Sequence, residues 1–182
     1  MGTPKALLRL RGETFLECLV RKVQDAGCAP VIVVLGHGAA LIRSSIPRVD
    51  VQFALNSDYS RGMLSSLQAG LECVPESASH VLFTLVDHPD PAPETLSQLV
   101  GAPEAPVVIP RHLGRKGHPV RIARSISKEL LALPTDATAK DVLNRHLDAT
   151  LFFDLDDPGI VDDIDDPAAY DGLLARTERR PS

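Results

Sequence analysis

An apolar run that ends in an acid constrains the fold of this chain most strongly. Residues 81–86 read VLFTLV, and Asp87, His88 and Pro89 follow directly. A near-continuous apolar run of this length, rich in β-forming residues, predicts a strand that is buried on both faces, as in a parallel sheet. Pro89 cannot donate a backbone hydrogen bond and biases the residue before it toward an extended conformation. The sequence therefore places the Asp87 carboxylate where a buried strand leaves the sheet.

This position of Asp87 has two interpretations. Ligands of open α/β sheets bind outside the carboxyl ends of the strands. A carboxylate there is unfavourable unless it is solvated, paired or bound to a cation, so Asp87 is a candidate Mg²⁺ ligand for a phosphate-bearing substrate. In the other interpretation Asp87 caps the following turn, and Pro89 makes that turn rigid. The motif by itself leaves both interpretations open.

Composition limits the class of protein. The chain has 182 residues, 44% of them hydrophobic and 24% charged, which predicts one globular domain with a sizeable core. A formal net charge of −5 argues against a nucleic-acid or acidic-membrane surface. The sequence shows neither an apolar stretch of the roughly 20 residues that a membrane span requires nor a secretory signal. Cys18, Cys28 and Cys73 lack zinc-site spacing. These features together predict a cytoplasmic protein.

Helical and strand-like patterns alternate along the chain. Helical spacing of apolar residues is found in the ranges 13–26, 63–74, 93–100, 125–133, 138–147 and 167–175, and a short helical stretch runs toward Ile46. Strand-like runs occupy the ranges 30–36, 49–55, 81–86, 107–109, 119–123 and 150–155. This alternation predicts the α/β class, with a mostly parallel sheet covered by helices on both faces. We expect a single domain over residues 1–176 and a polar tail over residues 177–182.

Two cationic segments are candidates for binding an anion. The chain begins with MGTPK, a small and flexible segment whose Lys5 would pair with a phosphate or simply remain solvated. The second segment, RHLGRKGHP at residues 111–119, lies between two predicted strands. It forms either an anion pocket or a solvated hairpin. Within it His118 stands out, because it lies between Gly117 and Pro119, where the backbone geometry is restricted.

A polar segment follows the strand that ends near residue 55. Residues 56–67 read NSDYSRGMLSSL and open the helix predicted from residue 63. Gly62 allows close approach to the backbone, and the first N–H groups of the helix are free for a polar ligand. Asn56, Ser65 and Ser66 offer donors and acceptors suited to a base edge or a ribose. The alternative is an ordinary loop followed by the first turn of a helix.

The segment GIVDDIDDP, residues 159–167, holds four carboxylates within five positions. Like charges this close repel one another unless a cation or solvent screens them. Asp163 and Asp165 alternate around an isoleucine, which places both on one face of an extended segment. Paired with Asp87, one of them would complete a sparse, water-rich Mg²⁺ site. A helix start capped by Asp165 or Asp166 is the other interpretation, and both can hold together.

With these segments in order, the chain resembles the MobA-like nucleoside triphosphate transferases, and most of all the molybdenum cofactor cytidylyltransferases. The family pattern runs from MGxPK through N…GM.SSL..GL, a strand ending in LxDxP, and GHP to DIDTP before a helix that contains tyrosine. The matching segments here are Met1–Lys5, Asn56–Leu71, Leu85–Pro89, Gly117–Pro119 and Asp163–Pro167 with Tyr170. No single motif is strong, but five of them in order and at family-like spacing are specific.

The resemblance implies a Rossmann-like nucleotidyltransferase domain. Such an enzyme would transfer a nucleotidyl group from an NTP, with CTP preferred over GTP, to a phosphate acceptor and release pyrophosphate. The implied acceptor is a molybdopterin-type cofactor, which a molybdoenzyme would then receive. No nucleic acid or membrane partner is implied, and Mg²⁺ is the implied cofactor.

The resemblance also implies roles for the matching residues. Asp87, together with Asp163 or Asp165, would hold Mg²⁺. The implied catalytic residues are Lys5, Asp87 and Asp165. The implied nucleotide-binding residues are Gly2, Lys5, Asn56, Gly62, Ser65 and Ser66. The implied acceptor-binding residues are Gly117 and His118.

The chain departs from the family pattern in two places. The family begins with a strand and a glycine-rich loop, LAAGxGxR, directly before MGxPK, and both are absent here. That strand would lie beside the Asp87 strand, so we expect exposed apolar surface, poor solubility and poor activity. A start codon assigned too late, or a truncated chain, is the expected cause, and a functional degenerate protein is the alternative. The second departure is that residues 135–141 replace a GDxGAR segment and Asp166 replaces the threonine of DIDTP, which puts the acceptor in doubt.

Two other functions remain open from the sequence. The same fold serves transferases that act on sugar phosphates or polyol phosphates, and the fold alone does not determine the substrate. A non-catalytic carrier that holds a nucleotide or molybdopterin is favoured by the absent glycine-rich loop. The carboxylates Asp87, Asp163 and Asp165 argue against a carrier, because such a protein has no evident use for acids at both places.

Overall fold

The computed structural model describes residues 2–47, 49–134 and 137–178 of the chain. Met1, residues 135–136 of the departing segment and residues 179–182 of the predicted tail lie outside the described residues. The helices are α1 Phe15–Asp25, α2 Ala39–Ser45, α3 Met63–Glu72, α4 Pro93–Val100, α5 Arg124–Leu131, α6 Ala139–Arg145 and α7 Pro167–Glu178. Each agrees with a predicted helix to within a few residues. Helix α7 continues to Glu178, beyond its predicted end at residue 175.

The strands are short, and several of the predicted strand ranges are longer than the strands observed. They are β1 Arg9–Leu10, β2 Glu13–Thr14, β3 Ile32–Leu35, β4 Gln52–Leu55, β5 His80–Phe83, β6 Val107–His112, β7 Arg115–Lys116, β8 Val120–Ala123 and β9 Thr150–Asp154. Short 3₁₀ turns η1 Lys5–Leu7, η2 Tyr59–Arg61, η3 Leu147–Ala149 and η4 Pro158–Ile160 complete the elements. The α/β class is confirmed.

The central sheet is mixed, which corrects the expectation of a mostly parallel sheet. Its strand order is β5-β8-β6-β7, and β9 pairs with β6. β8 runs antiparallel to both β5 and β6, whereas β9 runs parallel to β6. The chain returns from β6 to β8 through the short β7 hairpin, and a connection of that length cannot make the crossover that a parallel pair needs.

A second, two-stranded parallel sheet stands apart from the central one. β3 pairs with β4 over Ile32–Leu35 and Gln52–Leu55. Among the described residues no ladder joins β3 to β5, so each of these strands has one edge without a partner strand. The resemblance puts an additional strand beside the Asp87 strand, which is the side of β5 that carries no ladder here.

β5 is shorter and more exposed than the sequence suggests. The apolar run 81–86 pairs only over His80–Phe83, where all residues are half-buried rather than buried. Its partner β8 begins at Val120, after Pro119, which has no N–H to continue the ladder. Asp87 therefore lies beyond the end of the strand, in the turn that follows an extended stretch.

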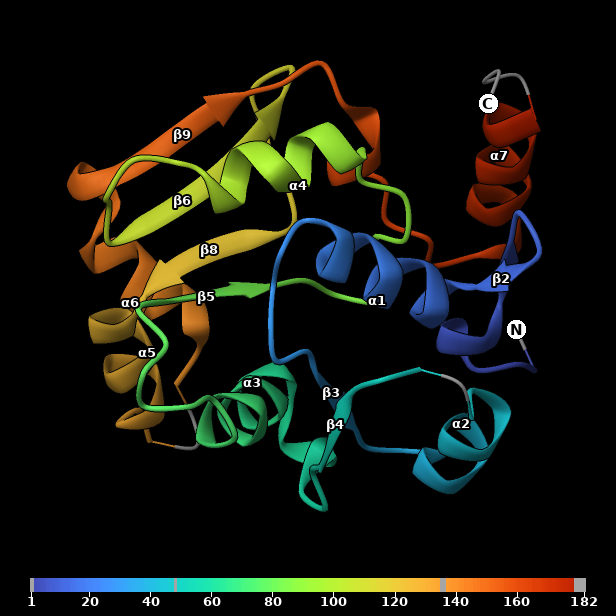
Figure 1. Ribbon diagram of the computed structural model, residues 1–182, viewed down its shortest axis with the longest axis horizontal. Helices are drawn as coiled ribbons and strands as arrows, with labels where there is room; N and C mark the ends of the chain where they lie inside the picture. The colour runs from blue at the N-terminus through green and yellow to red at the C-terminus, as the bar shows by residue number, and fades with distance from the viewer. Residues whose placement is uncertain (1, 48, 135–136, 179–182) are drawn as a thin grey trace.

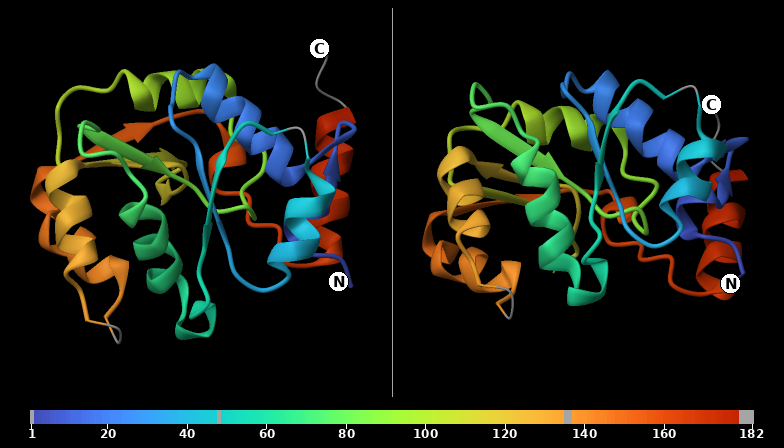
Figure 2. Two further views of the ribbon diagram at one scale, coloured as in Figure 1. Left: turned by 60° about the horizontal axis from the view of Figure 1, so that its bottom comes forward. Right: turned by 90° about the horizontal axis from the view of Figure 1, so that it is seen from below.

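Helices cover both faces of the central sheet, as expected (Figures 1 and 2). α4 lies with α1 on one face, whereas α3, α5 and α6 lie on the other. The main core forms between this second group of helices and strands β6 and β8. Its buried members are Leu64, Leu71, Val107, Ile109, Val120, Ile122, Ile126, Leu130 and Val142. Within the described residues no helix is long and apolar enough to cross a membrane.

The N-terminal part of the chain forms a hairpin that the sequence patterns did not indicate. β1 and β2 pair antiparallel around Arg11 and Gly12, which both have positive φ angles of 52° and 88°. Two positive φ angles in a two-residue loop are typical of the type I′ turn. The hairpin leads into α1, where Thr14 and Glu17 form a capping box that fixes the start of the helix.

A close backbone contact joins the segment after β5 to η4. The Asp157 carboxylate, 3% exposed, accepts hydrogen bonds from Ala92 N and Thr95 Oγ1, both at 2.7 Å, and from Gly159 N at 3.0 Å. A Cβ atom on Gly159 would lie 1.9 Å from the carbonyl oxygen of Asp90. Only glycine fits there, so this contact sets the distance between the two segments that carry the motifs DHP and DIDDP.

We expect Gly159→Ala to lower the free energy of unfolding by about 2–3 kcal/mol, because the new methyl group meets backbone that cannot rotate away. Urea denaturation measures the change. Gly172→Ala is the matched control, since its Cβ would lie 3.6 Å from Arg176 Nη1 inside helix α7, where alanine is favoured. Equal stability of the two variants would contradict the tight contact at Gly159.

Candidate metal and nucleotide site

Two segments far apart in sequence meet after β5 and place three donor side chains together. Asp87, His88 and Asp163 each offer one donor atom, and these atoms lie within 4.8 Å of one another. The side chains of Asp87 and His88 are 25% and 12% exposed. The backbone N–H of Ile164 donates to Asp87 O at 3.0 Å and so holds the acidic segment beside the turn. The structure thus brings together acids that the sequence predicted to meet.

Lys5 approaches the same cluster from η1. Its ammonium group hydrogen-bonds the Asp165 carboxylate and lies 3.7 Å from Asp87 Oδ2. Asp165 is therefore engaged by Lys5, while Asp163 is the acid that shares the cluster with Asp87. The sequence left open whether Asp163 or Asp165 partners Asp87. In the structure Asp163 lies beside Asp87, and Asp165 pairs with Lys5.

The pKa values of Asp163, Asp165 and Lys5 follow from these contacts. Burial raises the pKa of the Asp163 carboxyl, and the nearby charges of Asp87 and Asp165 raise it further. The hydrogen bond and charge of Lys5 lower the pKa of Asp165. Burial lowers the pKa of Lys5, but the carboxylates around it, Asp165 first, leave that pKa raised overall. A site that raises the pKa of a carboxyl through neighbouring carboxylates favours an added cation.

Unsatisfied polar atoms at the cluster fit a bound cation. Asp87 Oδ1 and His88 Nδ1 are buried and have no hydrogen-bond partner among the described residues. Buried polar atoms are normally hydrogen-bonded, so such atoms indicate a missing ligand or water. Carboxylate oxygen and imidazole nitrogen are both ligands of divalent metal ions. The residues present therefore fit a divalent metal.

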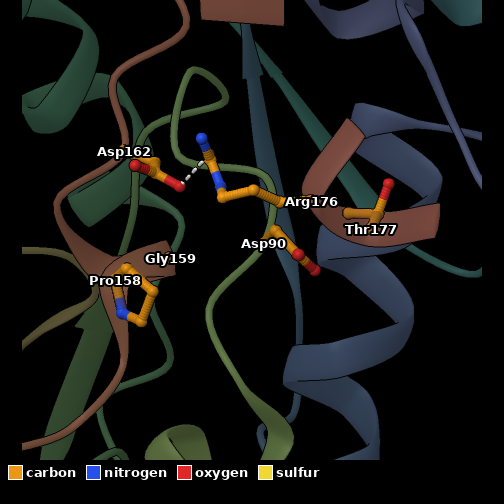
Figure 3. Close-up of a pocket in the computed structure, with 6 residues that line it drawn as sticks. All are labelled: Asp90, Pro158, Gly159, Asp162, Arg176 and Thr177. Atoms are coloured by element: carbon orange, nitrogen blue, oxygen red, sulfur yellow. Dashed lines mark hydrogen bonds and ion pairs between the residues drawn. The ribbon is translucent and has the colours of Figure 1, made fainter. Parts of the chain in front are cut away.

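Each acid of the segment 162–166 has its own neighbour. Asp162 pairs with Arg176 of α7, and Asp166 Oδ1 accepts a hydrogen bond from Ala169 N at 2.8 Å, which caps that helix. Asp163 thus fits the metal interpretation, and Asp166 fits the helix-start interpretation. A cavity of about 10 Å³ beside the Asp162 pair holds at most one water and no substrate (Figure 3). Its lining residues are Asp90, Pro158, Gly159, Asp162, Arg176 and Thr177.

His118 of the GHP motif packs against the cluster. Its ring stacks on His88 at 5.0 Å between centroids and meets Phe83 edge-on at 5.8 Å. Its backbone N–H donates to Ile160 O at 2.8 Å, and a Cβ on Gly117 would lie 2.4 Å from that same oxygen. Gly117 is thus required for close packing against η4, and His118 contacts His88 directly.

The surroundings of His118 keep its ring neutral. Burial, together with the charge of His88, lowers the pKa of His118 from 6.5 to about 4. Because the unfolded chain binds the proton more readily than the folded chain, stability falls as the pH falls from 6.5 toward 4.

We therefore expect the free energy of unfolding to rise between pH 4 and 6.5, with His118 contributing about 3 kcal/mol of that rise. Urea denaturation across this pH range should show a smaller slope for His118→Gln than for the unmodified chain. The C2 proton of His118 in NMR spectra should titrate near the lower limit. Identical slopes for both proteins would contradict a buried neutral ring.

The predicted base and ribose residues form one cluster at the end of β4. Asn56 is 6% exposed, and its Nδ2 donates to Ser65 Oγ at 2.9 Å and to Ser66 Oγ at 3.0 Å. Its Oδ1 accepts from Asp58 N at 2.9 Å. Gly62 has φ 101°, a left-handed value that favours glycine. Asn56 is therefore occupied in shaping this loop, a role that the sequence did not indicate.

The basic segment 111–119 forms a hairpin, which was one of its two interpretations. β6 and β7 pair around its tip, and Arg111 makes two hydrogen bonds to Asp154 at 2.9 and 2.7 Å. Arg111 and Lys116 also lie over the Phe152 ring, at 4.7 and 5.3 Å from its centroid. These two cations are thus engaged by neighbours of their own.

A buried ion pair fixes the turn after Asp87. Lys22 Nζ of α1 lies 2.7 Å from Asp90 Oδ1 and donates to Pro91 O at 2.9 Å, and both charged side chains are less than one-tenth exposed. Arg11 Nη1 lies 3.6 Å from the same carboxylate. The Cys18 thiol is buried and donates weakly to Pro89 O at 3.8 Å. Helix α1 thereby holds the segment that follows Asp87.

We expect Lys22→Met to lower the free energy of unfolding by about 3 kcal/mol or more, because it leaves a carboxylate buried without its closest cation. Urea denaturation measures the loss. Arg21→Met, which breaks the half-exposed pair with Glu13, should cost less than about 1 kcal/mol. Similar losses for the two variants would show that Lys22 contributes no more than a surface charge.

The structure also shows what the sequence analysis missed. His88 was noted as part of the DHP motif and given no role, yet one of its ring nitrogens joins the two acids. Its position directly after Asp87 was the available signal. Gly2 lies exposed at the start of the described chain, with open space around it.

Comparison with known proteins matches one family. The family model described as "MobA-like NTP transferase domain" covers residues 1–150. A relative, the nicotine blue oxidoreductase of Paenarthrobacter nicotinovorans, is 29% identical over an alignment of 172 residues that covers 89% of this chain and 83% of that protein. The family match confirms the resemblance to MobA-like transferases, although not the cytidylyltransferase subtype.

Solved structures of similar fold and sequence are also found. Rv0371c from Mycobacterium tuberculosis H37Rv is 28% identical with a TM-score of 0.85, and the match covers 96% of this chain and 90% of that one. A structure of Rv0371c in complex with manganese matches at 25% identity with a TM-score of 0.80, covering 94% and 91%. This chain is thus similar in fold and sequence to a protein crystallised with a divalent metal.

Proposed function

Because this chain belongs to the MobA-like NTP transferase family, we propose that it transfers a nucleotidyl group from an NTP to a phosphate acceptor and releases pyrophosphate. The observation that carries the proposal is the cluster of Asp87, His88 and Asp163, with Lys5 3.7 Å from Asp87. This arrangement gathers both the donors for a divalent metal and a cation for phosphate at the turn that follows β5.

The residues present would hold the metal mainly through Asp87 and Asp163. When bound, a divalent ion neutralises part of the phosphate charge. The manganese complex of the similar Rv0371c supports a divalent ion here, and the resemblance to the family implies Mg²⁺. Asp165 was also proposed as a ligand and a catalytic residue. Its bond to Lys5 favours a different role, in which Asp165 orients the Lys5 ammonium toward the triphosphate.

The chemistry needs positioning rather than a protein nucleophile. An oxygen of the acceptor phosphate bonds to the α-phosphorus as the bond from that phosphorus to the bridging oxygen breaks, and pyrophosphate leaves with the bond's electrons. A phosphate acceptor is already ionised near neutral pH, so no general base is required. Lys5 screens negative charge that builds up on the triphosphate, and its raised pKa keeps it protonated.

We also propose roles in nucleotide and acceptor binding. Gly2 and the loop built on Asn56, Gly62, Ser65 and Ser66 would shape the pocket for the base and ribose, with CTP preferred over GTP. Gly117 and His118 would lie on the acceptor side. The acceptor proposed is of the molybdopterin type, delivered afterwards to a molybdoenzyme in the cytoplasm. The alternatives are a sugar phosphate acceptor and a non-catalytic carrier of a nucleotide or molybdopterin.

A redox function is a second candidate. The observation in its favour is the relative named an oxidoreductase, which aligns with 89% of this chain. An assay with a reduced pyridine nucleotide and a dye acceptor tests it. Dye reduction that persists in Asp87→Asn would favour the redox function, because electron transfer has no need of a metal-binding carboxylate there.

Calorimetric titration of the chain with CTP and with GTP, in the presence and absence of a divalent metal, tests the transferase proposal. We expect metal-dependent binding that favours CTP, and Asp87→Asn should weaken it by about tenfold or more, since removal of a charged ligand costs more than 1.4 kcal/mol. Asp148→Asn, at an exposed acid of η3, is the matched control. Unchanged nucleotide binding in Asp87→Asn would contradict the proposed role of the cluster.

A further inference from the structure

His88 is placed as a ligand rather than as a turn residue. One of its ring nitrogens lies within 4.8 Å of a carboxylate oxygen of Asp87 and of Asp163. Its Nε2 lies 3.9 Å from Asp87 Oδ1, an atom that has no hydrogen-bond partner among the described residues. Its Nδ1 is buried and likewise lacks a hydrogen-bond partner there. Donors that share one ion, with bonds of about 2.0–2.2 Å, lie about 3 to 4.4 Å apart. The three donors would therefore have to move closer together when an ion binds.

The ring of His88 is held in place by its neighbours. It stacks on His118 with an angle of 29° between the planes. His118 is itself fixed by the edge-on contact with Phe83 and by the bond from its backbone N–H to Ile160 O. Only 12% of the His88 side chain is exposed. A ring fixed in this way presents its nitrogen to the site without losing much conformational freedom on binding.

We propose that His88 is a nitrogen ligand of the metal beside Asp87 and Asp163, and that it makes the site prefer a transition-metal ion such as Mn²⁺, Co²⁺ or Zn²⁺ to Mg²⁺. This inference rests on the proposed function and refines it. Mg²⁺ takes oxygen ligands almost entirely, whereas imidazole favours transition metals, with affinity rising from manganese toward zinc. The donor set of two carboxylates and one imidazole therefore selects against the ion that the sequence motifs suggest.

Electron spin echo spectroscopy of bound Mn²⁺ tests the nitrogen ligand directly. The unmodified chain with one equivalent of Mn²⁺ should show ¹⁴N coupling from a coordinated imidazole, and His88→Gln should lose it. His146→Gln is the matched control, because His146 lies 2.9 Å from Glu129 and is likewise an imidazole beside a carboxylate. The control should keep the coupling.

Metal titrations measure the selectivity. We expect His88→Gln to weaken Mn²⁺ and Co²⁺ binding by about 10- to 100-fold, while Mg²⁺ binding changes by less than about threefold. Absence of ¹⁴N coupling in the unmodified chain, its persistence in His88→Gln, or equal losses for Mn²⁺ and Mg²⁺ would each overturn the inference.

Two further measurements keep the test decisive. If His88→Gln does not fold, the unmodified chain labelled with ¹⁵N-histidine should show ¹⁵N coupling in place of ¹⁴N, and an unchanged ¹⁴N signal would overturn the proposal. Nucleotide titration separates this inference from the function. Metal-dependent NTP binding without imidazole coupling contradicts the role of His88 alone, whereas imidazole coupling without any NTP binding contradicts the transferase function alone.

Discussion

The buried pair of Lys22 and Asp90 is the interaction on which the site depends most. Two opposite charges placed in the interior of a small domain are tolerated only when each satisfies the other. The pair fixes helix α1 to the turn that follows Asp87, and Gly159 then brings η4 against the backbone of Asp90. The Lys22–Asp90 ion pair and the absence of a side chain at Gly159 therefore fix the positions of Asp87 and of the acidic segment after η4.

The same principle explains how a crowded set of acids is accommodated. The four carboxylates of residues 162–166 do not share one environment, because Arg176, Lys5 and the first turn of α7 each engage a different one. Asp163 is the acid that joins the Asp87 cluster. Asp162, Asp165 and Asp166 are thus engaged by neighbours within the chain. The pKa of Asp163 is raised by burial and by the nearby carboxylates, so a bound cation would stabilise its charged form.

Sequence reasoning succeeded where local patterns decide the structure. Helices with clear apolar spacing, such as α1 and α3, were predicted from motifs, as was the approach of the acidic segment to Asp87, although the motifs left open whether Asp163 or Asp165 joins it. It failed where tertiary contacts decide. Strand β8 runs antiparallel because of the hairpin before it, and β5 stops early because its partner begins after Pro119. The internal bonding of Asn56 depends on how the loop folds back, which no spacing rule contains.

Lys5 and Asp165 form an ion pair across a separation of 160 residues. Closing so long a loop costs entropy that local contacts cannot offset, so the pair forms only after most of the domain has folded. During synthesis Lys5 leaves the ribosome well before the acidic segment does, because 160 residues separate Lys5 from Asp165. The chain therefore completes its site at the end of folding, and a partly made molecule carries the cation of the site without the acid that restrains it.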